Sequence, residues 1–198
     1  MQTKKIISMM KWSCSDSSGG SAYTDNHQEL ITIFVEDKGM QMKLNDSGEK
    51  ITSEEIRSFE QDFSIVLPED YKSFLEESNG GMPDGDYVFE FFDEVTERIN
   101  HSVIQEFFIL NTNEDGSYND LKNNCMNLWN DEALGKSDIP FALDPGGNYL
   151  CLSLNSDDYG TVYLCNHEYE DADTGYLVKS KVADSFSKFL ESLSLDAD

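Results

Sequence analysis

Residues 67–81, with the sequence LPEDYKSFLEESNGG, specify one helix together with both of its ends. Pro68 fits the start, because a proline in the first helical turn loses no hydrogen bond, and Glu69 and Asp70 stabilise the positive end of the helix dipole. Gly80 supplies the left-handed residue at which a helix ends, and apolar side chains recur between the two ends at helical spacing. The segment therefore predicts a short helix that packs on a core through one face.

A second helix is predicted immediately before it. Thr52 and Glu55 have the spacing of a capping box, and Ile51 and Ile56 occupy the positions of a hydrophobic staple. Phe59 continues the apolar face one turn later. Two closely connected helices are thus expected to precede the sheet.

Strand patterns dominate the rest of the chain. Six segments have the composition of β-strands and are separated by turn residues: 87–92, 103–110, 139–143, 149–154, 161–165 and 176–178. A helix is predicted over residues 117–129, and another at the carboxyl end with Val182, Phe186 and Leu190 on its apolar face. The predicted fold class is α+β, with a largely antiparallel sheet of about six strands and helices packed against it.

The amino-terminal part differs in composition. Residues 13–28 are rich in Ser, Gly, Asn and Asp, whereas the apolar run 30–35 and the alternating residues 40–44 flank a turn and predict a hairpin. We therefore divide the chain into an amino-terminal extension, residues 1–48, which adds strands to the main domain, and a main domain, residues 49–198.

The net charge restricts the choice of partners. The chain has 39 acidic residues against 14 Lys or Arg, a formal charge of −25. Residues 1–48 hold five basic and six acidic side chains, so nearly all of the excess lies in residues 49–198. Such a field repels nucleic-acid phosphates and anionic lipid, and it speeds encounter with basic proteins. The charge argues against direct nucleic-acid or membrane binding and favours a basic protein partner; the alternative is that the acids only keep the protein soluble.

Cysteine spacing and the amino terminus indicate a cytoplasmic protein. Cys14, Cys125, Cys151 and Cys165 form neither a C-x-x-C pair nor a disulfide framework, so reduced thiols are expected. The first apolar run is interrupted by a serine and is too short for a signal peptide, and no segment approaches a membrane span.

No catalytic or cofactor motif was found. Residues 111–116 resemble the first half of a calcium loop, but Lys122 stands where a bidentate glutamate is needed. His27, His101 and His167 lack the sequence motifs that accompany a Ser or Cys nucleophile. The glycine pairs lack the lysine of a phosphate-binding loop. We expect no metal, no cofactor and no enzymatic activity.

Uncompensated acids suggest where a basic partner binds. Eight acids and no base lie between Lys72 and Arg98, and the same holds between Lys136 and Lys179. The candidate partner-binding residues drawn from these windows are Asp84, Asp86, Glu94, Asp157, Asp158, Glu168, Glu170, Asp171 and Asp173. We predict that they form or flank a face for a basic partner; the alternative is a set of scattered, solvated acids.

Several short motifs occur in a recognisable order. They are LPEDY at 67–71, NGG at 79–81, IPFALD at 139–144, GGN at 146–148, GTVY at 160–163 and SFSKFL at 185–190. Together they resemble the SUKH superfamily, cell-wall assembly regulator type, over roughly residues 50–195. Most of the motif residues have a structural explanation, since the prolines and glycines begin and end elements and the aromatic residues pack.

The resemblance implies a small α+β domain without a known catalytic centre. Bacterial members of the superfamily are mostly immunity proteins against polymorphic toxins, many of them nucleases, whereas fungal members resemble scaffolds in cell-wall regulation. The resemblance therefore predicts an immunity protein that binds a cognate toxin of nuclease type and occludes its active site or substrate groove. The alternatives are a non-catalytic regulatory scaffold or adaptor and, more remotely, an unrecognised hydrolase.

Overall fold

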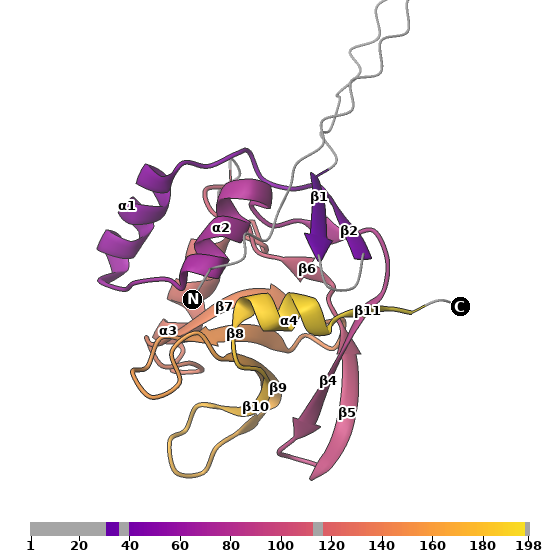
Figure 1. Cartoon of the computed structure of the whole chain (residues 1–198). Helices are drawn as coiled ribbons and strands as arrows, with labels where there is room; N and C mark the ends of the chain where they lie inside the picture. The colour runs from indigo at the N-terminus through magenta and orange to yellow at the C-terminus, as the bar shows by residue number, and fades with distance from the viewer. Residues whose placement is uncertain (1–30, 36–39, 113–116, 197–198) are drawn as a thin grey trace, which may run out of the picture.

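The computed structural model describes residues 31–35, 40–112 and 117–196 (Figure 1). Within these ranges the chain forms four helices, α1 (Ser53–Phe63), α2 (Glu69–Ser78), α3 (Leu121–Asn130) and α4 (Phe186–Ser192). The strands are β1 (Ile31–Val35), β2 (Met40–Asn45), β3 (Met82–Pro83), β4 (Tyr87–Asp93), β5 (Arg98–Val103), β6 (Glu106–Phe107), β7 (Asp138–Leu143), β8 (Tyr149–Ser153), β9 (Val162–Glu170), β10 (Leu177–Ala183) and β11 (Ser194–Leu195).

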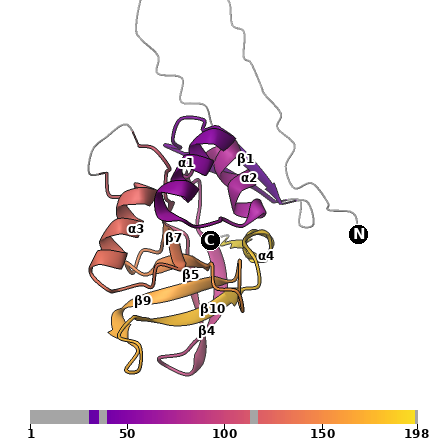
Figure 2. The same ribbon diagram turned by 90° about the vertical axis from the view of Figure 1, so that its left-hand side faces the viewer.

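The strands are arranged in three antiparallel sheets. The largest has the order β10-β9-β8-β7-β6, and two three-stranded sheets have the orders β1-β2-β3 and β11-β4-β5. The predicted α+β class with antiparallel pairing is confirmed, with the strands shared among these three sheets. Figures 1 and 2 show the β4–β5 hairpin beside the large sheet, where β4 lies along β10.

The two predicted helices near the start of the main domain form as their end signals indicate. The Thr52 hydroxyl accepts a hydrogen bond from the Glu55 N–H, and the Glu55 carboxylate accepts one from the Thr52 N–H, which completes the capping box of α1. Pro68 is the N-cap of α2, and Asn79 ends this helix in the left-handed conformation with φ of 45°. Gly80 follows with φ of 76°, as its predicted role requires.

The Asn79-Gly80-Gly81 turn also attaches α2 to the rest of the fold. The Asn79 side chain accepts from the Leu110 N–H at 2.9 Å and donates to the Leu110 carbonyl at 3.0 Å and the Glu49 carbonyl at 2.8 Å. A Cβ at Gly80 would lie 2.5 Å from the Phe108 carbonyl oxygen, so only glycine permits this close backbone approach. The motif is therefore a structural junction.

Aromatic side chains hold α2 and α4 on one face of the large sheet. The Phe186 ring of α4 lies 5.1 Å from the Tyr71 ring, 5.0 Å from that of Phe74 and 5.3 Å from that of Phe141 on β7. All four side chains are buried, and such ring pairs add about 0.5–1.5 kcal/mol each beyond the burial of their area. The core therefore lies between the two helices and the sheet.

The strands of the amino-terminal extension join this core. β1 and β2 form the predicted hairpin, and Leu44 of β2 pairs with Pro83 of β3. Ile33, Met42 and Leu44 are buried in the main hydrophobic core. The polar segment 13–28 and the hairpin turn lie outside the described residues, and the division of the chain at residue 48 stays a prediction.

The region after β4 differs from the prediction. The apolar run 103–110 was expected to be one strand, but it is interrupted after Val103 and contributes only β6 further on. The strand that pairs with β4 is β5, with the sequence RINHSV. Both of its faces are largely exposed, so it lacks the alternation of apolar and polar residues that predicts a strand. The final helix begins at Phe186, since Ser185 caps it, and Val182 belongs to β10.

Candidate partner-binding surface

The nine acids predicted from the sequence lie in four places. Asp84 and Asp86 are in the β3–β4 connection, and Glu94 is in the β4–β5 turn. Asp157 and Asp158 are in the β8–β9 loop, which lies beside the α1–α2 connection because the Tyr159 hydroxyl donates to the Val66 carbonyl at 3.0 Å. The remaining four, Glu168, Glu170, Asp171 and Asp173, lie at the outer end of the β9–β10 hairpin.

Two of these places meet at one end of the molecule. Both Figure 1 and Figure 2 show the tips of the β4–β5 and β9–β10 hairpins projecting at the lower end. The backbone N–H of Glu94 donates to the Ser180 hydroxyl at 3.1 Å, which fixes the β4–β5 turn against β10. The structure thus brings Glu94 to the same end as the four acids of β9–β10, and it places the β3–β4 and β8–β9 acids elsewhere.

Three of the nine carboxylates have structural roles. Asp84 accepts from the Lys43 N–H and the Tyr87 hydroxyl. Burial alone would raise the pKa of Asp158, but hydrogen bonds from Ser153 and Tyr163 outweigh it and lower that pKa. Asp171 accepts from Thr174 and Asp173 and so closes the β9–β10 turn, and the hydrogen bond from the Thr174 backbone lowers its pKa.

The other acids at this end are open to solvent. Within the described ranges, the carboxylates of Glu94, Glu168, Glu170 and Asp173 are exposed and form no hydrogen bond or ion pair. Glu97, in the same turn as Glu94, is also exposed. We call these five residues the acidic tips.

Few bases offset the acidic tips. Lys179 pairs with Asp138, with its Nζ 3.0 Å from Oδ1, and Lys181 pairs with Asp184 at 2.8 Å. Arg98 of β5 is the base nearest in sequence to the β4–β5 turn. The local field is therefore negative, and it decays over about 8–10 Å at physiological ionic strength.

Exposed apolar side chains accompany these acids. Phe92 of β4 and Ile99 of β5 are cross-strand partners and are 45% and 58% exposed. Tyr169 and Tyr176, near the β9–β10 tip, are 47% and 38% exposed. Aromatic anchors surrounded by polar residues are typical of protein–protein interfaces.

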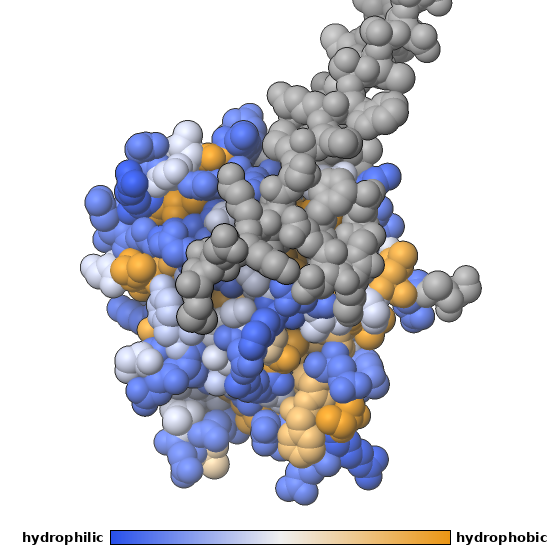
Figure 3. All heavy atoms as spheres, viewed as in Figure 1, coloured by the Kyte–Doolittle hydropathy of each residue, from blue (hydrophilic) through white to orange (hydrophobic). Residues whose placement is uncertain are grey.

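The outward side of the β4–β5 hairpin carries most of this apolar surface. We call it the hairpin face, and it comprises three cross-strand pairs, Val88–Val103, Glu90–His101 and Phe92–Ile99. The Glu90 carboxylate lies 3.2 Å from His101 Nε2. Figure 3 shows hydrophobic residues gathered over this hairpin at the lower right, with hydrophilic residues around them.

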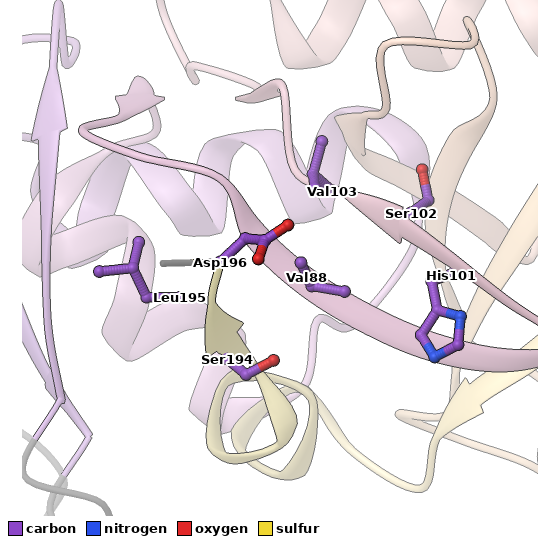
Figure 4. Close-up of a pocket in the computed structure, with 7 residues that line it drawn as sticks. All are labelled: Val88, His101, Ser102, Val103, Ser194, Leu195 and Asp196. Carbon is purple, nitrogen blue, oxygen red and sulfur yellow. The ribbon is translucent and has the colours of Figure 1, made fainter. Parts of the chain in front are cut away.

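A shallow groove continues the hairpin face toward the carboxyl end. Its volume is about 460 Å³, and Val88, Val103, Leu195 and Asp196 are among its lining residues. Figure 4 shows the lining side chains coming from the adjacent strands β11, β4 and β5 and from Asp196, which directly follows β11. The lining is mixed, with polar side chains at His101, Ser102, Ser194 and Asp196 and apolar ones at Val88, Val103 and Leu195.

The described residues offer few groups for metal or thiol chemistry. No group of three or more His, Cys, Asp or Glu side chains there is placed to hold a metal ion. Cys125 and Cys151 are buried, and this burial raises the pKa of each thiol, which keeps them protonated and unreactive.

These features define an α+β domain with an acidic, partly apolar surface that is a candidate for partner binding. Residues 50–192 match the model of the SMI1 / KNR4 family (SUKH-1), and the chain belongs to this family. Domains of the family are generally non-catalytic. No match to a curated protein was found.

Among the described residues, every helix is too short or too polar to cross a membrane.

The acids predicted from the sequence include four of the five acidic tips, all but Glu97, but the prediction missed β5 and the hairpin face. The polar sequence of β5 gave no strand pattern, although Phe92 next to Phe91 in a strand required one of these two aromatic residues to face outward.

Proposed function

We propose that this protein is a cytoplasmic bacterial immunity protein that binds a basic toxin domain of nuclease type and blocks its substrate groove. The observation that carries the proposal is the acidic tips next to exposed aromatic side chains in a family that is generally non-catalytic. A nuclease needs a cationic groove for its substrate, and a surface with the opposite charge and without reactive groups is suited to cover it.

The charge supports this proposal in a second way. With a formal charge of −25, the protein repels nucleic acid and anionic membranes, so the nucleic acid held by a nuclease would compete with it rather than assist it. Association with a cationic groove would be accelerated by electrostatic steering at low salt. Inhibition would come from occlusion, without a chemical step and without a cofactor.

A regulatory scaffold or adaptor is the second candidate. It is favoured by the same exposed aromatic residues, which fit any protein partner. Co-expression separates the two candidates. If a toxin domain encoded by a neighbouring gene is produced in a sensitive host, the immunity function predicts that co-expression restores growth and that the two chains co-purify. Death at equal protein levels would exclude immunity to that toxin.

The contribution of the acidic tips can be tested by charge reversal. The test variant changes Glu94, Glu168, Glu170 and Asp173 to Lys. The matched control makes the same change in total charge at four exposed acids elsewhere, Glu49, Glu54, Asp131 and Glu132. Asp171 and Asp158 are left unchanged because their carboxylates hold loops.

Association rates are measured at several salt concentrations with a catalytically inactive toxin domain. We expect the test variant to associate at least about tenfold more slowly at low salt and with a flatter salt dependence, and the control to change much less. Equal rates for the two variants would show that total charge, and not the acidic tips, governs association.

A further inference from the structure

Among the described strands, β5 is an edge strand, and some of its backbone groups have no partner in the described ranges. In the sheet β11-β4-β5 it pairs on one side only, with β4, and the register contains no bulge. The Ile104 N–H donates to the Tyr87 carbonyl, so Ile104 faces β4, and alternation turns the N–H and C=O of Ile99, His101 and Val103 away from it.

In the described ranges, one of these outward backbone groups has a hydrogen-bond partner and the others have none. The His101 N–H donates to Asn100 Oδ1 at 3.0 Å, which is a local substitute for a strand partner. Within the described ranges, no residue forms a hydrogen bond with the outward N–H of Ile99 or Val103, or with the outward carbonyls of Ile99, His101 and Val103. As far as the described residues are concerned, five backbone groups on this six-residue strand are therefore free to pair with another chain.

The edge lacks the devices that usually prevent pairing. Natural edge strands carry a proline, a bulge, several charges or a covering element. β5 has no proline and no bulge, and it carries one fully charged side chain, Arg98. Its side chains are exposed along the first four residues. An edge of this kind is ready to accept a strand.

The surroundings of the edge indicate the chemistry of that strand. Ile99 and Val103 would contact apolar side chains of an added strand on the hairpin face. Residues 86–103 contain five acids, Asp86, Glu90, Asp93, Glu94 and Glu97, against one Arg, so Lys or Arg side chains are favoured beside them. A second copy of this chain would bring two strongly negative molecules together, which opposes pairing between copies.

We propose that the free edge of β5 binds an extended segment of the toxin, in which apolar side chains alternate with Lys or Arg, by adding it as a fourth strand to the sheet β11-β4-β5. This inference rests on the proposed function and specifies how the partner is held. Backbone hydrogen bonds would supply affinity, and the hairpin face together with the acidic β4–β5 turn would supply selectivity.

The direct test is amide hydrogen exchange, measured by NMR on the free protein and on its complex with a catalytically inactive toxin domain, taken from a toxin gene that neighbours its own. The amides of Ile99 and Val103 are expected to exchange rapidly in the free protein and at least about 100-fold more slowly in the complex, because each becomes a donor to the added strand. The amides of Asn100 and Ser102 face β4 and serve as internal references.

Two variants provide an independent measurement. Ile99→Pro removes an outward N–H, which an edge strand tolerates because no bond to β4 is lost, and Ile99→Ala shortens the same side chain while the N–H stays. Ile99→Pro is expected to bind about tenfold more weakly than Ile99→Ala, which corresponds to the loss of one backbone hydrogen bond. Circular dichroism and thermal unfolding confirm that both variants are folded.

Complex formation without slower exchange at Ile99 and Val103 overturns the edge-strand inference and leaves the proposed function intact. If no complex forms with the wild-type protein, the proposed function fails and the inference fails with it. If exchange at these two amides slows in the free protein as its concentration rises, the edge pairs with a second copy, and the inference is again overturned.

Discussion

Asn79→Ala is expected to destabilise the fold, because the side chain of Asn79 replaces a strand partner for Leu110. The variant leaves the buried Leu110 N–H unpaired, which costs about 2 kcal/mol, and removes a bond to the Leu110 carbonyl, which costs about 1 kcal/mol. The third bond, to the Glu49 carbonyl, contributes little because Glu49 is exposed and water can replace the amide. The free energy of unfolding should fall by about 3 kcal/mol.

Urea unfolding, followed by tryptophan fluorescence and circular dichroism, measures this change. Asn155→Ala is the control, since Asn155 is exposed and its side-chain amide bonds, among the described residues, only to the Ser153 hydroxyl. Its effect should stay within about 0.5 kcal/mol. Asn79→Gly separates strain from hydrogen bonding, because glycine relieves the positive φ of 45° but makes none of the three bonds. If Asn79→Gly were as stable as the wild type, the hydrogen-bonding explanation would be wrong.

Two further predictions concern buried polar groups. Burial raises the pKa of Asp138, and the nearby Lys179 partly counters it, so Lys179→Met should raise that pKa further and cost about 3 kcal/mol at pH 7. A carboxyl whose folded-state pKa lies above its unfolded value destabilises the fold when it is ionised. The cost of Lys179→Met should therefore shrink as the pH falls through the folded-state pKa of Asp138. A cost that does not depend on pH in urea unfolding would contradict the pairing. Tyr71 has a fully buried hydroxyl without a hydrogen-bond partner among the described residues. Tyr71→Phe should therefore raise the free energy of unfolding by about 1 kcal/mol, and a loss of stability in calorimetry would refute this.

The elements with local end signals were predictable from the sequence. The capping box at Thr52, the proline before α2 and Gly80 after it each act through neighbouring residues, and the structure shows them in those roles. The meander of β7, β8 and β9 was also predictable, because buried strands with apolar runs alternate with glycine and aspartate turns. The α+β class followed from these elements.

What depends on distant contacts was not predictable. β5 exists because β4 supplies its hydrogen bonds, and its own exposed sequence contains no strand signal. Charge windows found Glu94 and the β9–β10 acids, but sequence distance does not report which loops meet at one end of the fold. It also does not show that Asp84, Asp158 and Asp171 already hold loops through hydrogen bonds.

The central claim is that this domain neutralises a toxin by binding it. The most direct measurement titrates the purified protein against the nucleic-acid cleavage activity of a purified nuclease toxin domain, taken from a toxin gene that neighbours its own. The claim predicts that activity falls linearly and vanishes near one equivalent, because occlusion is stoichiometric and needs no turnover. Full cleavage activity in the presence of a large excess of folded protein would contradict it.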